Sequence, residues 1–286
     1  MYSIWLLEYA HVQKQHIGSV LSGQHNKGYR ELAFTYMLLK GNGLTILIDT
    51  GTNGENEATL KLHKRDGVLD WQPPSKVLAK VGIKPEDVDY ILISHAHYDH
   101  INNMQAFPKA HFFVQEKEIL GWVWAMTREK KFRFPNMALN NQDIFDALHL
   151  IVENRMTLVD GEVKNVLPDI DLYPAYDGHS FGSQIIVINN PDGIWENVGD
   201  LAYVQENLTG IDNTGTYVPV GLAVGSPYNL IKSLDDMMKI ANNDMHRIII
   251  GHEPNNWTKF PTKKYDDGLH VAEIALAEGD KSIFVK

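Results

Sequence analysis

The chain has 286 residues, a net charge of −10 and no cysteine. The lack of cysteine excludes disulfides, thiolate metal ligands and a cysteine nucleophile, and it fits the reducing cytosol, where we expect the protein to work. The acidic balance argues against a nucleic-acid partner. No apolar run approaches the ~20 residues of a membrane-spanning helix, and residues 1–8 lack the basic start of a signal peptide, so we expect no membrane partner.

Apolar runs and turn signals predict a layered α/β fold of mixed sheets in one domain, residues 1–286. Asn-Gly at 42–43 joins two β-prone runs, which is a hairpin signal. Residues 55–72 are polar, and we expect an irregular excursion there, whereas residues 117–155 predict an enlarged helical and aromatic insertion. The expected elements, in chain order, are strands at 32–39 and 44–48, a helix at 73–81, strands at 88–93 and 110–114, helices at 115–128 and 141–150, strands at 156–159, 170–174, 184–189 and 194–198, a helix at 227–241 and a strand at 247–250.

The most informative segment is Ser-His-Ala-His-Tyr-Asp-His at 94–100, which follows the apolar run 90–93. Imidazole nitrogens and carboxylate oxygens are ligands that zinc and similar divalent metals accept. Ligands in layered α/β proteins gather at strand ends of this kind. The alternative is a polar loop that caps the next helix. The candidate metal ligands in this segment are His95, His97, Asp99 and His100.

Further candidates lie at later strand ends or turns. His179 stands in Asp-Gly-His-Ser, Asp200 follows Val-Gly, and His252 follows the apolar run 248–250. Tyr203 lies three residues after Asp200. Each of these residues alone is a plain turn or packing residue, but together with the motif at 95–100 they predict a metal site.

These residues resemble the metallo-β-lactamase superfamily, over about residues 30–255. The resemblance implies an αββα sandwich with two mixed β-sheets and outer helices. It also implies two divalent metal ions, with zinc preferred and manganese, iron or cobalt acceptable. In that family pattern, one ion is held by His95, His97 and His179, the other by Asp99, His100 and His252, and Asp200 bridges them.

Residues 200–208 resemble the stretch after the bridging aspartate in N-acyl homoserine lactonases. This resemblance implies a hydrolase that opens a lactone or related ester, such as an N-acyl homoserine lactone or an aromatic-ring lactone, by attack of a hydroxide shared between the metals. Asp99 would then carry the proton to the leaving group and Tyr203 would bind the carbonyl. Asp49, in an Asp-Thr-Gly turn, is a candidate to orient a ligand histidine. The chain departs from these lactonases at 101–103 and at 177–180.

Other functions stay open at this stage. The same site would suit hydrolysis of a thioester, amide, aryl ether or phosphodiester, and an iron-dependent sulfur dioxygenase is a further alternative. Diiron flavoproteins of this fold place a glutamate where this chain has His97, which argues against that branch. A non-catalytic binding module is expected to have lost ligands, and this chain has lost none.

The insertion carries several large apolar side chains. They either line a pocket for the apolar or aromatic part of a small-molecule substrate or form the core of the inserted segment. A homo-oligomer also stays open. The residues concerned are Trp122, Trp124, Phe132, Phe134 and Met137.

Overall fold

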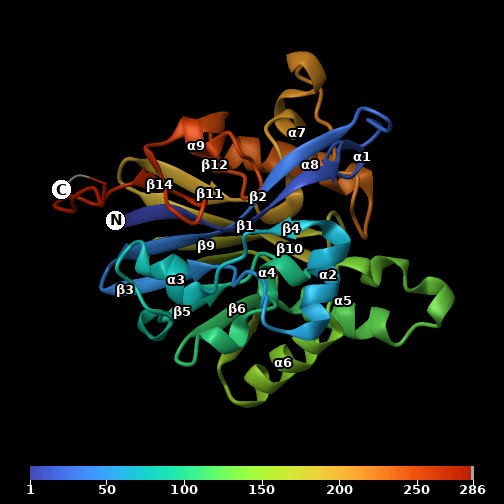
Figure 1. Ribbon diagram of the computed structural model, residues 1–286, viewed down its shortest axis with the longest axis horizontal. Coiled ribbons are helices and arrows are strands. Elements are labelled where there is room, and N and C mark those ends of the chain that lie inside the picture. The colour runs from blue at the N-terminus through green and yellow to red at the C-terminus, as the bar shows by residue number, and fades with distance from the viewer. Residues whose placement is uncertain (285–286) are drawn as a thin grey trace.

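Two β-sheets pack face to face in the computed structural model, which describes residues 1–284 (Figure 1). The larger sheet has the order β13 (Thr262–Lys264), β14 (His270–Ala275), β1 (Tyr2–His16), β2 (Tyr29–Gly41), β3 (Leu44–Ile48), β5 (Tyr90–Leu92), β6 (His111–Gln115) and β7 (Met156–Val159), with β4 (Val68–Leu69) paired to β1. The smaller sheet has the order β12 (Ile248–Ile249), β11 (Gly193–Asn197), β10 (Gly182–Asn190), β9 (Ile170–Tyr176) and β8 (Val163–Leu167).

Helices cover the outer faces of both sheets. The described helices are α1 (Ile17–Val20), α2 (Glu57–Asp66), α3 (Pro74–Ala79), α4 (Tyr98–Ile101), α5 (Glu116–Met126), α6 (Asn141–Val152), α7 (Glu206–Thr209), α8 (Pro227–Ile240) and α9 (Asn256–Lys259). Within residues 1–284, none of them combines the length and the apolar character needed to cross a membrane.

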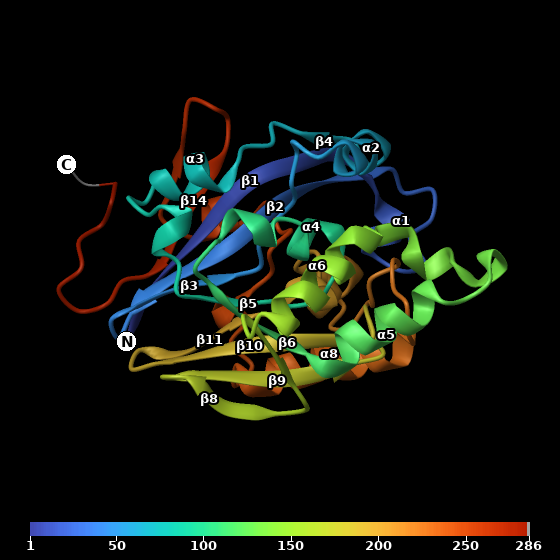
Figure 2. The same cartoon turned by 90° about the horizontal axis from the view of Figure 1, so that it is seen from below.

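Three apolar clusters hold these layers together. The middle cluster joins the two sheets and includes Ile4 of β1 and Ile186 of β10. The outer face of the larger sheet packs against α3, α5 and α6, and the outer face of the smaller sheet packs against α8. The two sheets lie one above the other in Figure 2. The predicted αββα sandwich is therefore confirmed.

The sequence analysis missed the longest strand of the fold. β1 pairs with β2 along most of its length and with β14 on its other side. Its side chains alternate between the middle cluster, as Leu6 does, and the helix-covered cluster, as Leu7 does. Because both faces are buried, the strand is almost continuously apolar and lacks the alternation typical of a half-exposed strand.

The expectation of an irregular excursion at 55–72 was wrong, because α2 occupies its centre. The Asn56 side chain accepts hydrogen bonds from the backbone of Ala58 and Thr59 and thereby caps the first turn. Gly67 ends the helix with φ of 75°, a left-handed conformation that glycine adopts at low cost. The helix is mostly polar, so its apolar periodicity is too weak to stand out.

The expected insertion consists of α5, α6 and a connecting segment of short 3₁₀ turns, residues 127–140, that extends away from the sheets (Figures 1 and 2). The structure divides its apolar residues between the two interpretations. Trp122 is fully buried in the outer cluster, whereas Trp124, Phe132 and Phe134 are 56%, 59% and 71% exposed. Met137 is also exposed, so the core explanation holds for Trp122 and fails for the other four residues.

One buried carboxyl makes stability depend on pH. Glu196 of β11 lies opposite Val187 of β10, and neither of its oxygens has a hydrogen-bond partner within the described chain. Burial raises the pKa of Glu196 to about 8. The folded protein therefore holds this proton from about pH 5 to pH 8, where the unfolded chain loses it, and stability falls as the pH rises.

We predict that Glu196→Gln removes this fall in stability with pH. In wild type the free energy of unfolding falls by about 1 kcal/mol for each pH unit between about pH 5 and pH 8. Urea unfolding of wild type and variant at several pH values measures it, and the difference between the two proteins is the readout. Glu86→Gln, at an exposed position, is the matched control and should leave the pH profile unchanged. Parallel profiles for wild type and Glu196→Gln would contradict the prediction.

Candidate metal centre

The candidate ligands come from loops and turns that follow strands of both sheets. Because each strand is anchored by its pairing and its apolar contacts, the residues that follow it start from a fixed position. His95 and His97 lie between β5 and α4, Asp99 and His100 lie in α4, His179 lies between β9 and β10, Asp200 follows β11, and His252 follows β12.

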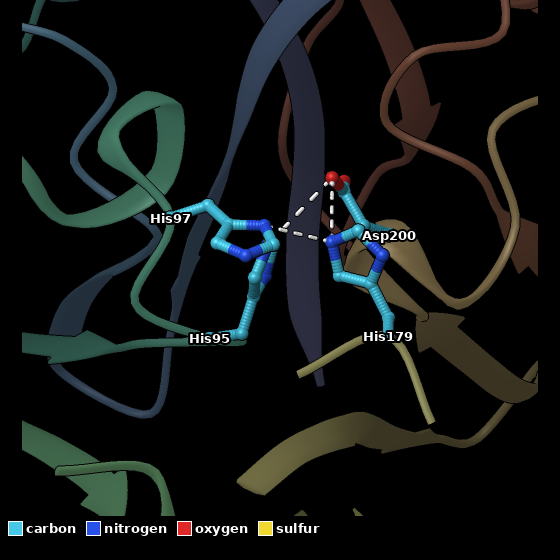
Figure 3. A group of neighbouring side chains, drawn as sticks. All are labelled: His95, His97, His179 and Asp200. Atoms are coloured by element: carbon cyan, nitrogen blue, oxygen red, sulfur yellow. Dashed lines mark hydrogen bonds and ion pairs between the residues drawn. The ribbon is translucent and has the colours of Figure 1, made fainter. Parts of the chain in front are cut away.

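The first group consists of His95, His97, His179 and Asp200, all buried (Figure 3). Nδ1 of His97 lies 3.0 Å from Nε2 of His95 and 2.9 Å from Nε2 of His179. Oδ2 of Asp200 lies 3.2 Å from Nε2 of His179 and 3.6 Å from Nε2 of His95. Three ring nitrogens and one carboxylate oxygen thus face a common point.

The second group consists of Asp99, His100, His252 and, again, Asp200. Oδ1 of Asp200 lies 3.0 Å from Nε2 of both His100 and His252. Oδ2 of Asp99 lies 3.6 Å from the same two nitrogens. Asp200 therefore belongs to both groups and turns one carboxylate oxygen toward each.

The charges of these side chains fit divalent cations. Burial, together with the neighbouring His100, lowers the pKa of His95 well below its usual value, which favours the neutral imidazole that binds metals. Burial would raise the pKa of Asp200, but the surrounding histidines, led by His100, hold it well below the usual range. Burial would lower the pKa of His100, but the carboxylates around it, led by Asp200, raise it well above its usual value. The carboxylates of the second group thus favour a positive charge at the place where a cation would bind.

Buried atoms without hydrogen-bond partners also indicate that metal ions fit the two groups. Nε2 of His100 and Oδ1 of Asp200 are buried and close together, yet they are not aligned for a hydrogen bond, and each lacks a partner within residues 1–284. Buried polar atoms without partners are rare because their desolvation is costly. Metal ions held by the two groups would satisfy both atoms, so the residues present fit a dinuclear site.

Asp49 orients two of the candidate ligands, as its position after β3 suggested. Its Oδ2 lies 2.7 Å from Nδ1 of His100 and accepts a hydrogen bond from Oγ of Ser94, while its Oδ1 accepts one from the Ser94 backbone. Ser94 Oγ in turn lies 3.1 Å from Nδ1 of His95. Gly199, with φ of 49°, packs so closely here that a Cβ atom would lie 2.9 Å from Oγ of Ser94. Such contacts fix the ring orientation of ligand histidines.

Backbone carbonyls orient two further histidines. Nδ1 of His179 donates to the carbonyl of Leu222 at 2.9 Å, and Nδ1 of His252 donates to the carbonyl of Ala33 at 2.6 Å. In the neutral imidazole, a proton on Nδ1 leaves Nε2 free to bind a metal, and both Nε2 atoms face Asp200. The two rings are therefore set in the tautomer that ligation by Nε2 requires.

The candidate centre lies in a cleft of about 350 Å³, which His97, Asp99, Asp200, Tyr203 and His252 help to line. The ring of Tyr203 lies 5.2 Å from that of His252, centroid to centroid. Burial, followed by the nearby Asp200 and Asp99 carboxylates, raises the pKa of Tyr203 well above its usual value. Tyr203 therefore keeps its proton at neutral pH and is able to donate a hydrogen bond.

The sequence analysis missed Glu118, a fully buried carboxylate of α5. Its Oε1 accepts hydrogen bonds from the Ala96 backbone and from Nε1 of Trp122, both at 2.7 Å. Its Oε2 accepts from Oγ of Ser180 at 2.7 Å and from the Gly182 backbone at 2.5 Å. Glu118 thus ties the residue between His95 and His97 to the residue after His179. Glu118 directly follows Glu116 and Lys117 in the first turn of the helix, so nothing local in the sequence distinguishes it from a solvated residue.

The departure at 101–103 from the lactonase pattern has a structural role. Oδ1 of Asn102 accepts hydrogen bonds from the Asn53 backbone and from Oγ1 of Thr59, and its Nδ2 donates to Asp143 of α6. Asn102 therefore connects α4, which carries two candidate ligands, to both α2 and α6.

The site and the fold together define the class of protein. Residues 31–252 match the family model of the metallo-beta-lactamase superfamily, and the chain belongs to that superfamily of metal-dependent hydrolases.

Among curated proteins, the chain is similar to an N-acyl homoserine lactonase of Bacillus cereus, with 26% identity over 159 residues, 55% of this chain and 54% of that protein. It is also similar to the N-acyl homoserine lactonase AttM of Azorhizobium caulinodans, with 23% identity over 191 residues, 63% of this chain and 64% of that protein. The matches thus span between half and two thirds of these relatives.

Solved structures show the same fold. A B. thuringiensis AiiA mutant with N-decanoyl-L-homoserine bound at its active site superposes with a TM-score of 0.64, at 21% identity over 91% of this chain and 96% of that chain. AidC, a dizinc quorum-quenching lactonase in complex with a product, superposes with a TM-score of 0.65, at 18% identity over 97% of this chain and 96% of that chain.

We predict that Glu118→Gln weakens metal binding by the first group about 10- to 100-fold. The amide nitrogen would face hydrogen-bond donors in place of an accepting oxygen, and the spacing between the two histidine segments would change. Competition with a chelator, followed by metal analysis, measures the affinity.

Glu116→Gln, at an exposed position of the same helix, is the matched control. Selective loss of one metal equivalent in Glu118→Gln, with the fold intact by circular dichroism, is the expected result. Equal affinity of both equivalents for wild type and Glu118→Gln would contradict the role assigned to this carboxylate.

Proposed function

We propose that this protein is a dinuclear metal-dependent hydrolase that opens a lactone or a related ester. The observation that carries the proposal is the Asp200 carboxylate, which turns one oxygen toward each of two ligand groups in the cleft that Tyr203 also lines. The similarity to N-acyl homoserine lactonases supports a lactone as substrate. Two divalent ions, zinc by preference, would lower the pKa of coordinated water to ~7 and polarise the scissile carbonyl.

Asp99 is the proposed proton carrier. Its carboxylate lines the cleft between His100 and His252, and the Tyr9 hydroxyl donates to its backbone carbonyl at 2.6 Å, which fixes the turn that carries it. In the proposed reaction Asp99 takes the proton of the attacking water and returns it to the leaving alkoxide as the ring opens. A positioned acid–base group of this kind typically contributes 10²- to 10⁴-fold to the rate.

Tyr203 is the proposed hydrogen-bond donor to the carbonyl oxygen. Its hydroxyl stays protonated at neutral pH, and its ring is held between those of His179 and His252. A hydrogen bond donated to the developing oxyanion is stronger in the transition state than in the ground state, so it lowers the barrier.

The direct test is hydrolysis of a lactone panel. Purified protein, loaded with Zn²⁺ or with Mn²⁺, is incubated with acyl-homoserine lactones and aromatic-ring lactones, and acid release is followed in a pH-stat. We expect acid release that a chelator abolishes. A metal-loaded, folded protein that releases no acid from any lactone or ester would refute the proposal.

We predict that Asp99→Asn lowers kcat by 10²-fold or more while the protein still binds metal, because the amide loses the proton-carrying function but keeps one oxygen. Steady-state kinetics and metal analysis on the same preparation measure both quantities. Asp66→Asn, at another carboxylate that lines the cleft, is the control. Wild-type turnover by Asp99→Asn would remove this residue from the mechanism.

We predict that Tyr203→Phe lowers kcat/KM about 10- to 100-fold at unchanged metal content, because the variant keeps the ring packing and loses the hydrogen-bond donor. The kinetic constants are measured with the best lactone of the panel. A loss confined to long-chain substrates, with short ones unaffected, would mean that Tyr203 packs against the substrate tail instead.

A further inference from the structure

A groove on the inserted segment lies next to the cleft of the candidate metal centre. The groove has a volume of about 550 Å³ and is lined almost wholly by apolar side chains, among them Trp124, Phe132 and Phe181. Trp124 and Phe132 are more than half exposed. Exposed aromatic side chains gathered around a hollow typically mark a binding site.

A small hollow, called the neck, lies between the groove and the cleft. The neck has a volume of about 10 Å³, shares Met137, Ala138 and Leu222 with the cleft, and shares Pro135 and Val224 with the groove. The three hollows are therefore adjacent, and the series that leads from the candidate metal centre to the exposed aromatic side chains is called the track.

The two walls of the neck are held in different ways. The wall at 222–224 is fixed to a candidate ligand, because His179 donates to the Leu222 carbonyl and its own carbonyl accepts from the Val224 backbone at 2.9 Å. The opposite wall, at 134–138, is linked to α2 by Arg65, whose Nη1 donates to the Met137 carbonyl at 2.6 Å. Arg65 is itself paired with Asp66.

One polar atom of the neck, Nε2 of His97, is available to bind a ligand. Of the residues that line it, His97 alone is polar, and its Nε2 atom is buried without a hydrogen-bond partner within residues 1–284. A ligand that carries an acceptor, such as a carbonyl, at the start of an apolar chain would satisfy this nitrogen and place the chain along the apolar walls. The track therefore combines one polar contact near the metal centre with apolar surface beyond it.

We propose that the neck and the groove bind an elongated apolar tail of the substrate, an unbranched acyl chain attached through a carbonyl. The inference rests on the proposed function, and it makes the inserted segment the determinant of substrate choice. Burial of each further methylene in the track raises kcat/KM about fourfold, so chains that reach the groove are the preferred substrates.

The test compares N-butanoyl- and N-decanoyl-homoserine lactone. For wild type we expect kcat/KM to be at least tenfold higher with the longer chain. Val224→Trp fills the junction of neck and groove, and Phe132→Ser removes groove surface, so both should lower this ratio. Phe145→Ser, at an exposed aromatic residue of α6 outside the groove, is the matched control and should keep the wild-type ratio. A wild-type ratio near one, or an unchanged ratio in Val224→Trp, would overturn the inference.

A binding measurement separates this inference from the proposed function. The probes are 1-decanol and 1-butanol, which contain no hydrolysable bond, and tryptophan fluorescence reports binding beside Trp124. We expect 1-decanol to bind wild type and Phe145→Ser, and to bind Val224→Trp at least tenfold more weakly. That result together with no lactone hydrolysis would leave the track standing and refute the proposed function. Lactone hydrolysis without decanol binding would support the proposed function and refute the track.

Two variants of the groove, Trp124→Ala and Phe132→Ser, show whether a second copy of the chain covers it instead. Light scattering gives the molar mass of wild type, Trp124→Ala and Phe132→Ser in solution. A lower mass in both variants, with an unchanged chain-length ratio, would assign the groove to a subunit interface and overturn the inference. Equal masses with a lowered ratio support it.

Discussion

The architecture of the site depends on the carboxylate of Asp200. It is buried, it remains ionised among histidines, and its two oxygens face two different ligand groups. A buried anion is costly unless positive charge or hydrogen bonds compensate it. The chain compensates it by bringing together imidazoles from five separate positions, and the positions of those imidazoles in turn require both sheets to be packed as they are.

The surroundings of the ligands are as specific as the ligands. Asp49 and Ser94 hold His95 and His100 from one side, and Glu118 holds the segments of the first group from the other. Apart from the contact between the neighbours Ser94 and His95, these contacts link residues that are 22 to 64 positions apart along the chain. The site is thus built as two shells of side chains, in which the outer shell determines how the inner one is spaced.

Residue chemistry made the inner shell predictable from the sequence. His95, His97, Asp99 and His100 stand together after an apolar strand, so a local pattern proposes them. His179, Asp200 and His252 are plain turn residues when taken alone, and only the motif at 95–100 and the family resemblance made them candidates. Glu118 was not predictable in this way, because its role arises only from contacts between distant segments. β1 was missed because burial of both faces removed its periodicity, and α2 was missed because a polar helix shows little periodicity at all. The double role of Asn102 likewise depends on two helices that meet only in the fold.

The path of the chain through the sheets has a consequence for synthesis on the ribosome. The candidate ligands extend from His95 to His252, and β1, near the start of the chain, lies in the sheet between β2 and β14, which ends at Ala275. A nascent polypeptide that has emerged only to residue 251 holds neither the last imidazole nor the strand that completes the pairing of β1. Assembly of the centre is therefore a late event, and a truncated product would have no complete set of ligands for cellular metal.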